Sequence, residues 1–405
     1  MTHVIRFSCI PSSPLSKENL WLRKAGATED ITTSPNFVGN FGAILRMLQQ
    51  GANVKDGPKG LARFFKRVVR KMCLVRASGS DYLIRGLMTH IFRKLAIAFG
   101  LLIFCGVVAW HALPSQVAKG LIALNNASAG LRSKVISTDV GDIHYLEGGQ
   151  GETVLLVHGI YARKEHWVEV ARVLAKDYRV IAVDLPGFGD NALRADDDYL
   201  LDQQQANLLT VMQALEVKVV HVGANSMGAY VAALLAEEHP ELIASLSFIG
   251  SPLGVPTPTP SDMDKARDLG ITPLVVQTTE DFAERNEWLS PNIPYIPGPI
   301  LRTWSEDEVA RADHNARIWD VVHSKSDVPT VLDLAPALEM PTLIIWCQED
   351  RIFHISGAAI LERSLPSSHL ATLDNCGHVP MLDKPAAVAS EYLKFLSSLP
   401  DPEEQ

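Results

Sequence analysis

The sequence lacks the residue patterns that build metal centres, disulfide scaffolds and nucleotide sites. Its 405 residues include only five cysteines, and no two of them are spaced as Cys-x-x-Cys. That spacing argues against a disulfide-rich scaffold and a cysteine zinc site. Histidines and carboxylates do not cluster at metal-ligand spacing, and no glycine-rich phosphate loop is present. The sequence therefore predicts chemistry that needs neither a metal nor a cofactor.

Two of the five cysteines stand where a bond between them can be considered. Cys347 and Cys376 each follow a predicted strand, and the two strands are candidates for neighbours in one sheet. An oxidising compartment would permit a disulfide there. In the absence of any wider cysteine framework, the sequence favours two free thiols.

Charge is sparse and unevenly distributed along the chain. Charged residues make up 20% of the sequence, apolar residues 47%, and the net charge is -9. Residues 1–94 hold 16 basic against 5 acidic residues, whereas residues 95–405 hold 21 against 41. The apolar content suffices for a full core, and the 270 or so residues after position 135 suit one α/β domain (135–400) with an inserted cap.

The change of charge coincides with an apolar segment. Sixteen uncharged residues occupy positions 95–110, directly after Arg93 and Lys94. A membrane span needs about 17–25 residues, so this one is short. A buried core helix and a cleaved signal peptide are the alternatives, but no small-residue cleavage site follows at once. We therefore expect an uncleaved signal anchor at 88–114, with its N-terminal end cytoplasmic and the catalytic domain outside, in a periplasm-like space if the source is bacterial.

The segments on either side of this anchor carry weaker signals. Residues 1–87 are basic and are expected to be an extension without a fold, or an upstream extension of the reading frame before Met88. Around positions 61–71 an amphipathic helix on an anionic membrane surface is a second possibility, and a nucleic-acid patch is disfavoured. Residues 115–134 are expected to form a linker.

A serine stands where a strand-like run gives way to a helix-like one. Positions 217–222 are β-branched, positions 229–236 are small and helix-forming, and Ser226 lies on the turn between them. Such a turn demands small residues around the serine and leaves its hydroxyl exposed. Ala224 occupies the place where the usual motif has its first glycine. The pattern predicts a nucleophile elbow, the alternative being an ordinary strand-turn-helix.

The chain supplies the other two members of a catalytic triad in the required order. Asp350 follows an apolar strand at 341–346, and His378 follows a short strand at 370–373. Parallel strands end at one edge of a sheet, so both side chains are expected near Ser226. Glu349 and Asp383 are weaker candidates for the acid. The residues after the strand at 246–249 contain no carboxylate, which excludes the other common position.

The oxyanion of an acyl-transfer reaction needs two backbone donors. One is the residue after the nucleophile, Met227, and the other is expected in the loop after the strand 154–157, where His158-Gly159 precedes Ile160. We predict the backbone N–H groups of Ile160 and Met227 as the oxyanion hole. His158 and Asp184 are predicted to hold loops rather than to react.

Between positions 252 and 338 prolines divide the chain into short pieces. Short amphipathic helices are expected there, for example at 279–289 and 305–322. The segment is predicted to be a lid over the serine, with tryptophans and Tyr295 giving it an apolar lining suited to acyl chains.

These motifs together resemble the α/β-hydrolase superfamily, specifically membrane-anchored monoacylglycerol lipases and related bacterial lipases. The resemblance covers about 88–398 and rests on the following residues: His158-Gly159, Asp184 to Gly189, Gly223 to Gly228, Ile344 to Asp350, Ile355 to Ala358, and Asn375 to His378. It implies a mostly parallel, doubly wound sheet with an inserted helical lid, preceded by one transmembrane helix. It also implies ester hydrolysis through Ser226, Asp350 and His378, with an acyl-enzyme intermediate.

Ala224, Cys347 and Ala229 depart from the glycines usual in these lipases, and none of the departures removes a catalytic group. The expected partners are an ester or acylglycerol substrate and membrane lipid, with no nucleic acid, and the catalytic domain is expected to act as a monomer.

Two other functions compete with ester hydrolysis. The Asn225-Ser226-Met227-Gly228 sequence is also similar to hydrolases that split carbon–carbon bonds in ring-cleavage products. Those proteins usually have a Gly-Pro-Gly-type loop after His-Gly and a tryptophan after the catalytic histidine, where this chain has Ile160 and Val379. The second alternative is a non-catalytic member of the fold that binds a hydrophobic ligand, which would not require all three triad residues.

Overall fold

We describe a computed structural model of the chain that defines residues 81–292, 294–324 and 329–400. The sequence predicts no fold for residues 1–87. Of these, residues 1–80 lie outside the described part. The first described element is helix α4, Asp81–Ala112. Its segment Met88–Ala112 is long and apolar enough to cross a membrane, and it is the one such helix among the described residues.

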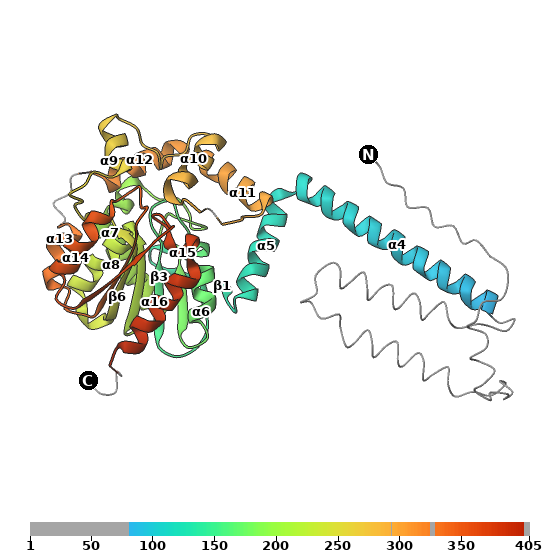
Figure 1. The fold of residues 1–405 in the computed structure, drawn as a ribbon, viewed down its shortest axis with the longest axis horizontal. Helices are drawn as coiled ribbons and strands as arrows, with labels where there is room; N and C mark the ends of the chain where they lie inside the picture. The colour runs from blue at the N-terminus through green and yellow to red at the C-terminus, as the bar shows by residue number, and fades with distance from the viewer. Residues whose placement is uncertain (1–80, 293, 325–328, 401–405) are drawn as a thin grey trace, which may run out of the picture. The chain divides into compact units, whose positions relative to one another are not determined.

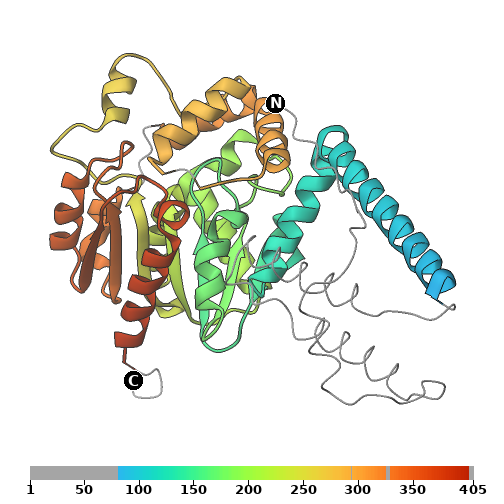
Figure 2. The same ribbon diagram turned by 45° about the vertical axis from the view of Figure 1, so that its right-hand side comes forward.

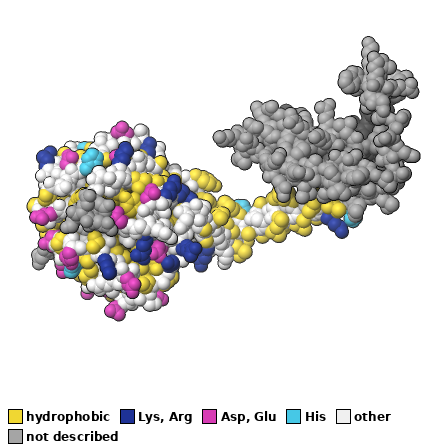
Figure 3. All heavy atoms as spheres, turned by 90° about the horizontal axis from the view of Figure 1, so that it is seen from below, with side chains coloured by type: hydrophobic (Ala, Val, Ile, Leu, Met, Phe, Trp, Pro, Cys, Tyr) yellow, Lys and Arg dark blue, Asp and Glu magenta, His cyan; other side chains and the backbone are white. Residues whose placement is uncertain are grey.

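Hydrophobic side chains predominate on the visible face of the segment Met88–Ala112 of α4, the rod-like part of Figure 3. Leu102 is 71% exposed, and Phe99 and Phe104 are 65% and 64% exposed. Water would strongly oppose such exposure, whereas lipid would not. The expectation of one apolar helix ahead of the α/β domain is confirmed.

The segment predicted as a linker, 115–134, is mostly a helix. Helix α5, Pro114–Ser128, begins immediately after α4, with proline in its first turn. It packs against α11, Gly298–Val309, a helix of the segment predicted as the lid. Ala118 and Asn126 are buried. The first strand already begins at Arg132, ahead of the predicted domain start at 135.

An eight-stranded mixed sheet forms the centre of the domain (Figure 1). Its order is β1-β2-β4-β3-β5-β6-β7-β8, in which β2 runs antiparallel to β1 and β4, and all other neighbours are parallel. The strands are β1 Arg132–Thr138, β2 Gly141–Gly148, β3 Thr153–Val157, β4 Arg179–Val183, β5 Val220–Ser226, β6 Ile243–Pro252, β7 Thr342–Cys347 and β8 Ser368–Leu373.

Alternating side chains of the parallel strands supply two cores, one on each face of the sheet. In β3, Leu155 and Val157 join one core, and Val154 and Leu156 join the other. The first core is covered by α7 (Leu201–Ala214), α8 (Met227–Glu238) and α14 (Ala358–Ser364), and the second by α6 (Val168–Leu174), α15 (Pro380–Asp383) and α16 (Pro385–Ser398). Because both faces are covered, the strands read as continuous apolar runs. The sheet is doubly wound, as expected.

In the described part of the segment between β6 and β7 there are five α-helices and one short 3-10 helix, Ala335–Ala337. The α-helices are α9 Asp262–Asp268, α10 Thr279–Leu289, α11 Gly298–Val309, α12 Ala312–Val322 and α13 Val331–Leu334. Figure 2 shows α10, α11 and α12 lying across one end of the sheet. The predicted helix at 279–289 coincides with α10. The predicted helix at 305–322 is wrong as one element, because the backbone leaves helical geometry at Arg311, where φ is −105° and ψ is 10°.

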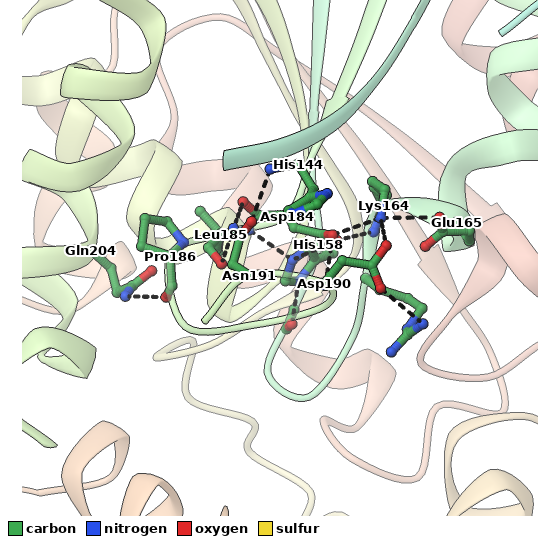
Figure 4. A network of polar contacts seen from close by, with 12 residues as sticks. His144, His158, Lys164, Glu165, Asp184, Leu185, Pro186, Asp190, Asn191 and Gln204 are labelled. Atoms are coloured by element: carbon green, nitrogen blue, oxygen red, sulfur yellow. Dashed lines mark hydrogen bonds and ion pairs between the residues drawn. The ribbon is translucent and has the colours of Figure 1, made fainter. Parts of the chain in front are cut away.

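A buried ion-pair network joins the loop after β3 to the loop after β4 (Figure 4). The Lys164 ammonium lies 2.8 Å from Asp184 Oδ2, 2.5 Å from Asp190 Oδ2 and 3.1 Å from Glu165 Oε1. Lys164 and Asp184 are fully buried. Burial by itself would lower the pKa of the Lys164 ammonium, but the carboxylates, Asp184 foremost, outweigh it and raise that pKa. Asp184 is the loop brace that the sequence predicts.

His158 holds the same two loops together. Its Nδ1 donates to the carbonyl of Gly159 over 2.7 Å, and its Nε2 accepts the backbone N–H of Leu185 over 3.0 Å. Burial lowers the pKa of this imidazole, so the ring is neutral and can both donate and accept. His158 is structural, as expected.

Removing the cation from this network should destabilise the fold. We expect Lys164→Met to lower the free energy of unfolding by about 3–5 kcal/mol, because Asp184 is then buried without a partner. Chemical denaturation of the purified full chain in detergent measures the loss. Lys176→Met, at an exposed position just after α6, is the control. A loss no larger than in the control would show that the ion pairs do not support the fold.

Candidate active site

Ser226 occupies a sharp turn between β5 and α8. It is the last residue of β5, and α8 begins at Met227. Its φ is 53° and its ψ is −119°, a conformation that L-residues rarely adopt. Backbone strain of this kind persists only where the surroundings enforce it, and it is the geometry of a nucleophile elbow.

The loop after β3 lies directly against this turn. A Cβ on Gly228 would come within 2.2 Å of the carbonyl oxygen of His158, and a Cβ on Gly159 within 3.0 Å of Ser226 Cβ. Any larger side chain at either position would push the loop and the turn apart. The close approach places Ile160, the next residue of the loop, beside the elbow.

Ala224 departs from the usual elbow sequence without disturbing the turn. It is fully buried in the middle of the sheet, between Val157 on β3 and Phe248 on β6. Its methyl group belongs to one of the two hydrophobic cores. The alanine therefore contributes packing, and the conformational demand falls on Ser226 two residues later.

Asp350 and His378 lie together at the same edge of the sheet. The Asp350 Oδ2 is 3.2 Å from His378 Nδ1, and its Oδ1 accepts the backbone N–H groups of Ile352 and Phe353 over 2.8 and 3.1 Å. Both side chains are buried. The ring of Phe353 lies 5.7 Å from the imidazole, centroid to centroid. These contacts fix the carboxylate and the imidazole relative to each other.

The two other candidates for the acid have different contacts. Glu349 is exposed, and its Oε2 accepts the backbone N–H of Cys376 over 3.2 Å. The carboxylate of Asp383 accepts the N–H of Gly377 over 2.7 Å, and the Ser290 hydroxyl also donates to it. Both side chains thus hold the backbone of the loop that carries His378.

Asn225 is a site residue that the sequence reasoning missed. Its amide Nδ2 donates to the carbonyl of Ile249 over 2.8 Å and to the carbonyl of His378 over 3.1 Å. The side chain is 2% exposed. Asn225 therefore ties the elbow both to β6 and to the histidine loop. A polar residue directly before the nucleophile, at a buried strand end, is the signal that could have revealed it.

Ser251 is a second missed residue. Its hydroxyl lies 2.6 Å from Asp350 Oδ2 and 2.9 Å from His378 Nδ1, and the side chain is fully buried at the end of β6. In the sequence, this position draws attention only as a place for a carboxylate, which Ser251 does not supply. The hydroxyl occupies the corner between the acid and the imidazole.

The expectation of two free thiols at Cys347 and Cys376 is wrong. The two residues form a disulfide, with Cα atoms 5.4 Å apart. Cys347 ends β7 and Cys376 follows β8, its parallel neighbour, so the fold brings the two sulfurs to one edge. The bond joins the loop of Asp350 to the loop of His378. The neighbouring position of β7 and β8 indicates this bond, whereas the spacing of the two cysteines along the chain does not.

Ser226 and His378 line one large cavity. Its volume is about 790 Å³, and it is bounded by α5, the loop after β3, and helices α10 and α11. Its lining is mainly apolar and includes Ile122, Phe282, Ile300, Trp304 and Leu382.

The two residues predicted for the oxyanion hole also lie at the elbow. Met227 is the first residue of α8 and is buried, and Ile160 lines the main cavity together with Ser226. A second, small space of about 30 Å³ is bordered by Ile160, Ser226 and Met227. Among the described residues, no group of histidines, cysteines and carboxylates could hold a metal ion.

The fold and this site define an α/β hydrolase. Residues 154–391 match the model of the alpha/beta hydrolase family, which covers more than half of the chain. The protein belongs to that family.

Three similar proteins indicate which kind of α/β hydrolase this chain resembles. The chain is 26% identical over 293 residues to Lipase 1 of Psychrobacter immobilis, covering 71% of this chain and 92% of the lipase. It is 26% identical over 261 residues to a monoacylglycerol lipase of Mus musculus, covering 62% and 77%. The crystal structure of a membrane phospholipase A, described as a bacterial virulence factor, superposes with a TM-score of 0.69 at 31% identity, covering 76% and 99%. These matches confirm the expected class of enzyme, a carboxylic ester hydrolase.

Loss of the disulfide should loosen the acid and histidine loops. We expect Cys347→Ala/Cys376→Ala to lower the free energy of unfolding by about 3–4 kcal/mol, because the bond closes a loop across a sequence separation of 29. A reductant should destabilise the wild type equally and leave the double variant unchanged. Thermal denaturation with and without reductant measures both effects, and Cys105→Ala, which removes an exposed free cysteine, is the control. An unfolding transition insensitive to reductant in the wild type would contradict the bond.

Proposed function

We propose that this protein is a membrane-anchored serine hydrolase that cleaves carboxylic esters of lipids, such as acylglycerols. Ser226 is the nucleophile, His378 the general base and acid, and Asp350 the carboxylate that orients the imidazole. The backbone N–H groups of Ile160 and Met227 bind the oxyanion. The observation that carries the proposal is that Ser226 and His378 line the same apolar cavity, with Asp350 in contact with the imidazole.

The proposed reaction proceeds in two halves. His378 takes the hydroxyl proton of Ser226 as its Oγ attacks the ester carbonyl, and the oxyanion accepts hydrogen bonds from the two backbone amides. His378 then gives the proton to the departing alcohol, which leaves an acyl-enzyme. Water attacks this ester while His378 accepts its proton. Collapse of the second intermediate returns that proton to Ser226 and releases the carboxylic acid.

The lining of the cavity favours a long acyl chain over a small polar ester. Burial of one methylene contributes about 0.8 kcal/mol, so an apolar cavity of about 790 Å³ can select substrates by chain length. The polar atoms that acyl transfer needs are concentrated at Ser226 and His378. This division between an apolar wall and a few polar groups is typical of binding sites for lipid-like ligands.

The place of α5 in the chain supports a substrate drawn from the membrane. Pro114 begins α5 two residues after the candidate membrane span ends at Ala112, and Leu121, Ile122 and Leu124 of α5 line the cavity. Only Leu113 thus separates the candidate span from the helix that forms this part of the cavity wall. We propose that the N-terminal side of the anchor is cytoplasmic and the catalytic domain faces outward, where an oxidising compartment would maintain the disulfide.

The alternatives are less well supported. Acidic ring-cleavage products would need a free cationic partner, whereas Arg285, the arginine of the cavity lining, is already ion-paired with Glu308. A binding-only role would leave the contacts of Asp350 and His378 without a purpose. We therefore retain ester hydrolysis.

The first test addresses the nucleophile. Replacement of Ser226 by alanine is expected to lower the hydrolysis of nitrophenyl esters at least about a thousandfold, because no other group can form the acyl-enzyme. The variant should also lose labelling by a fluorophosphonate probe. Ser364→Ala on α14 is the matched control and should retain both. Equal activity of Ser226→Ala and wild type would rule out the mechanism, and a folded wild type that resists labelling would favour a binding role.

The second test addresses the acyl site. Enlarging Ile122 to tryptophan should fill part of the cavity along α5 and shift the preference toward shorter chains. Loss of space for two methylenes corresponds to about a tenfold fall in kcat/KM for the longest good substrate relative to a short one. A series of nitrophenyl esters measures the profile. Lys119→Trp, on an exposed part of α5 outside the cavity lining, should leave the profile unchanged. An unchanged profile in Ile122→Trp would place the acyl chain elsewhere.

A further inference from the structure

We propose that Ser251 is a positioning residue for the acid and the base, so that the proposed triad works as a group of four side chains. The inference rests on the proposed function. It assigns to the end of β6 a role that the Ser-His-Asp mechanism does not require.

Three distances define this role. Ser251 Oγ lies 2.6 Å from Asp350 Oδ2 and 2.9 Å from His378 Nδ1, whereas Nδ1 and Oδ2 are 3.2 Å apart. The carboxylate can only accept, so the serine hydroxyl donates to it. The hydroxyl oxygen then accepts the N–H of Nδ1, which it shares with the carboxylate. The shorter of the two contacts of the imidazole N–H is the one to Ser251.

This arrangement holds the imidazole in the tautomer that catalysis needs. A proton on Nδ1 leaves the other ring nitrogen free to accept the proton of Ser226. Asp350 Oδ1 is occupied by two backbone N–H groups, so Oδ2 alone serves the imidazole and Ser251. The serine contact therefore restrains the one carboxylate oxygen that faces the ring.

The end of β6 is built to keep Ser251 in place. Gly250 has a φ of 83°, and a Cβ there would lie 2.5 Å from Asn225 Nδ2 and 2.6 Å from the carbonyl oxygen of His378. The strand end thus contacts both the elbow and the histidine loop. Ser251 is fully buried and is not among the described residues that line the cavity. Its substitution should therefore change turnover and leave substrate binding unaffected.

The first experiment separates turnover from binding. In the full chain in detergent, Ser251→Ala is expected to lower kcat about tenfold with KM unchanged, which corresponds to one hydrogen bond of about 1–1.5 kcal/mol. Ser245→Ala is the matched control. It also removes a buried hydroxyl of β6 that contacts a histidine, at 2.9 Å from His221 Nδ1, and should keep the wild-type kcat. Equal kcat values in the two variants, each measured where circular dichroism shows it folded, would overturn the proposal.

The second experiment moves the acid. Asp350→Ala should lower kcat by about 10³–10⁴, and Asp350→Ala/Ser251→Asp should recover at least tenfold of that loss, because a carboxylate at 251 can contact the imidazole directly. A purely structural role for Ser251 predicts no recovery, and that result would overturn the proposal. Failure of the proposed function can be told apart from failure of this inference, because in that case Ser226→Ala would remain active. If Ser226→Ala is inactive and Ser251 variants show neither effect, the nucleophile assignment stands and this inference fails alone.

Discussion

The site depends on the contact between two backbone segments, the loop after β3 and the turn that carries Ser226. Gly159 and Gly228 allow the contact, because a Cβ at either position would meet the opposite segment at 3.0 or 2.2 Å. Without this approach, the amide of Ile160 could not lie beside the elbow, and the positive φ of Ser226 would lose its support. The ion pairs of Lys164 and the hydrogen bonds of His158 stabilise the loop from the other side. Much of the polar structure around β3 and β4 thus serves one close contact.

The acid and histidine loops are held in a different way, by hydrogen bonds and a disulfide that link neighbouring strand ends. Asn225 ties the elbow to β6 and to the histidine loop, Ser251 joins β6 to the acid and the imidazole, and the disulfide joins the ends of β7 and β8. Each link spans two segments that are distant in sequence and adjacent at the sheet edge. Together they hold four strand ends.

The sequence predicts the sheet, the lid and Ser226, Asp350 and His378 because these follow from local order: an apolar strand, a turn, then a polar residue at its end. The role of Ser251 could not be predicted, since it arises from the adjacency of β6, β7 and β8 across the sheet. The sequence wrongly disfavours the Cys347–Cys376 bond, because only the sheet order shows that β7 and β8 are neighbours. Asn225 stands directly before the nucleophile, but its partners lie on β6 and on the histidine loop. Helix α5 was missed for a related reason. Its main partner is α11, about 180 residues later, and the local sequence does not show that contact.

The disulfide also bears on how the domain survives cleavage. Cys347 and Cys376 flank the segment that contains α14 and β8, which lies at the open end of the sheet. A protease that cuts the chain anywhere between them leaves the two fragments covalently joined. The strand that carries the histidine loop would then stay paired with β7 instead of diffusing away. In a compartment rich in proteases, the disulfide would thus allow the domain to keep its sheet after one cut in this segment.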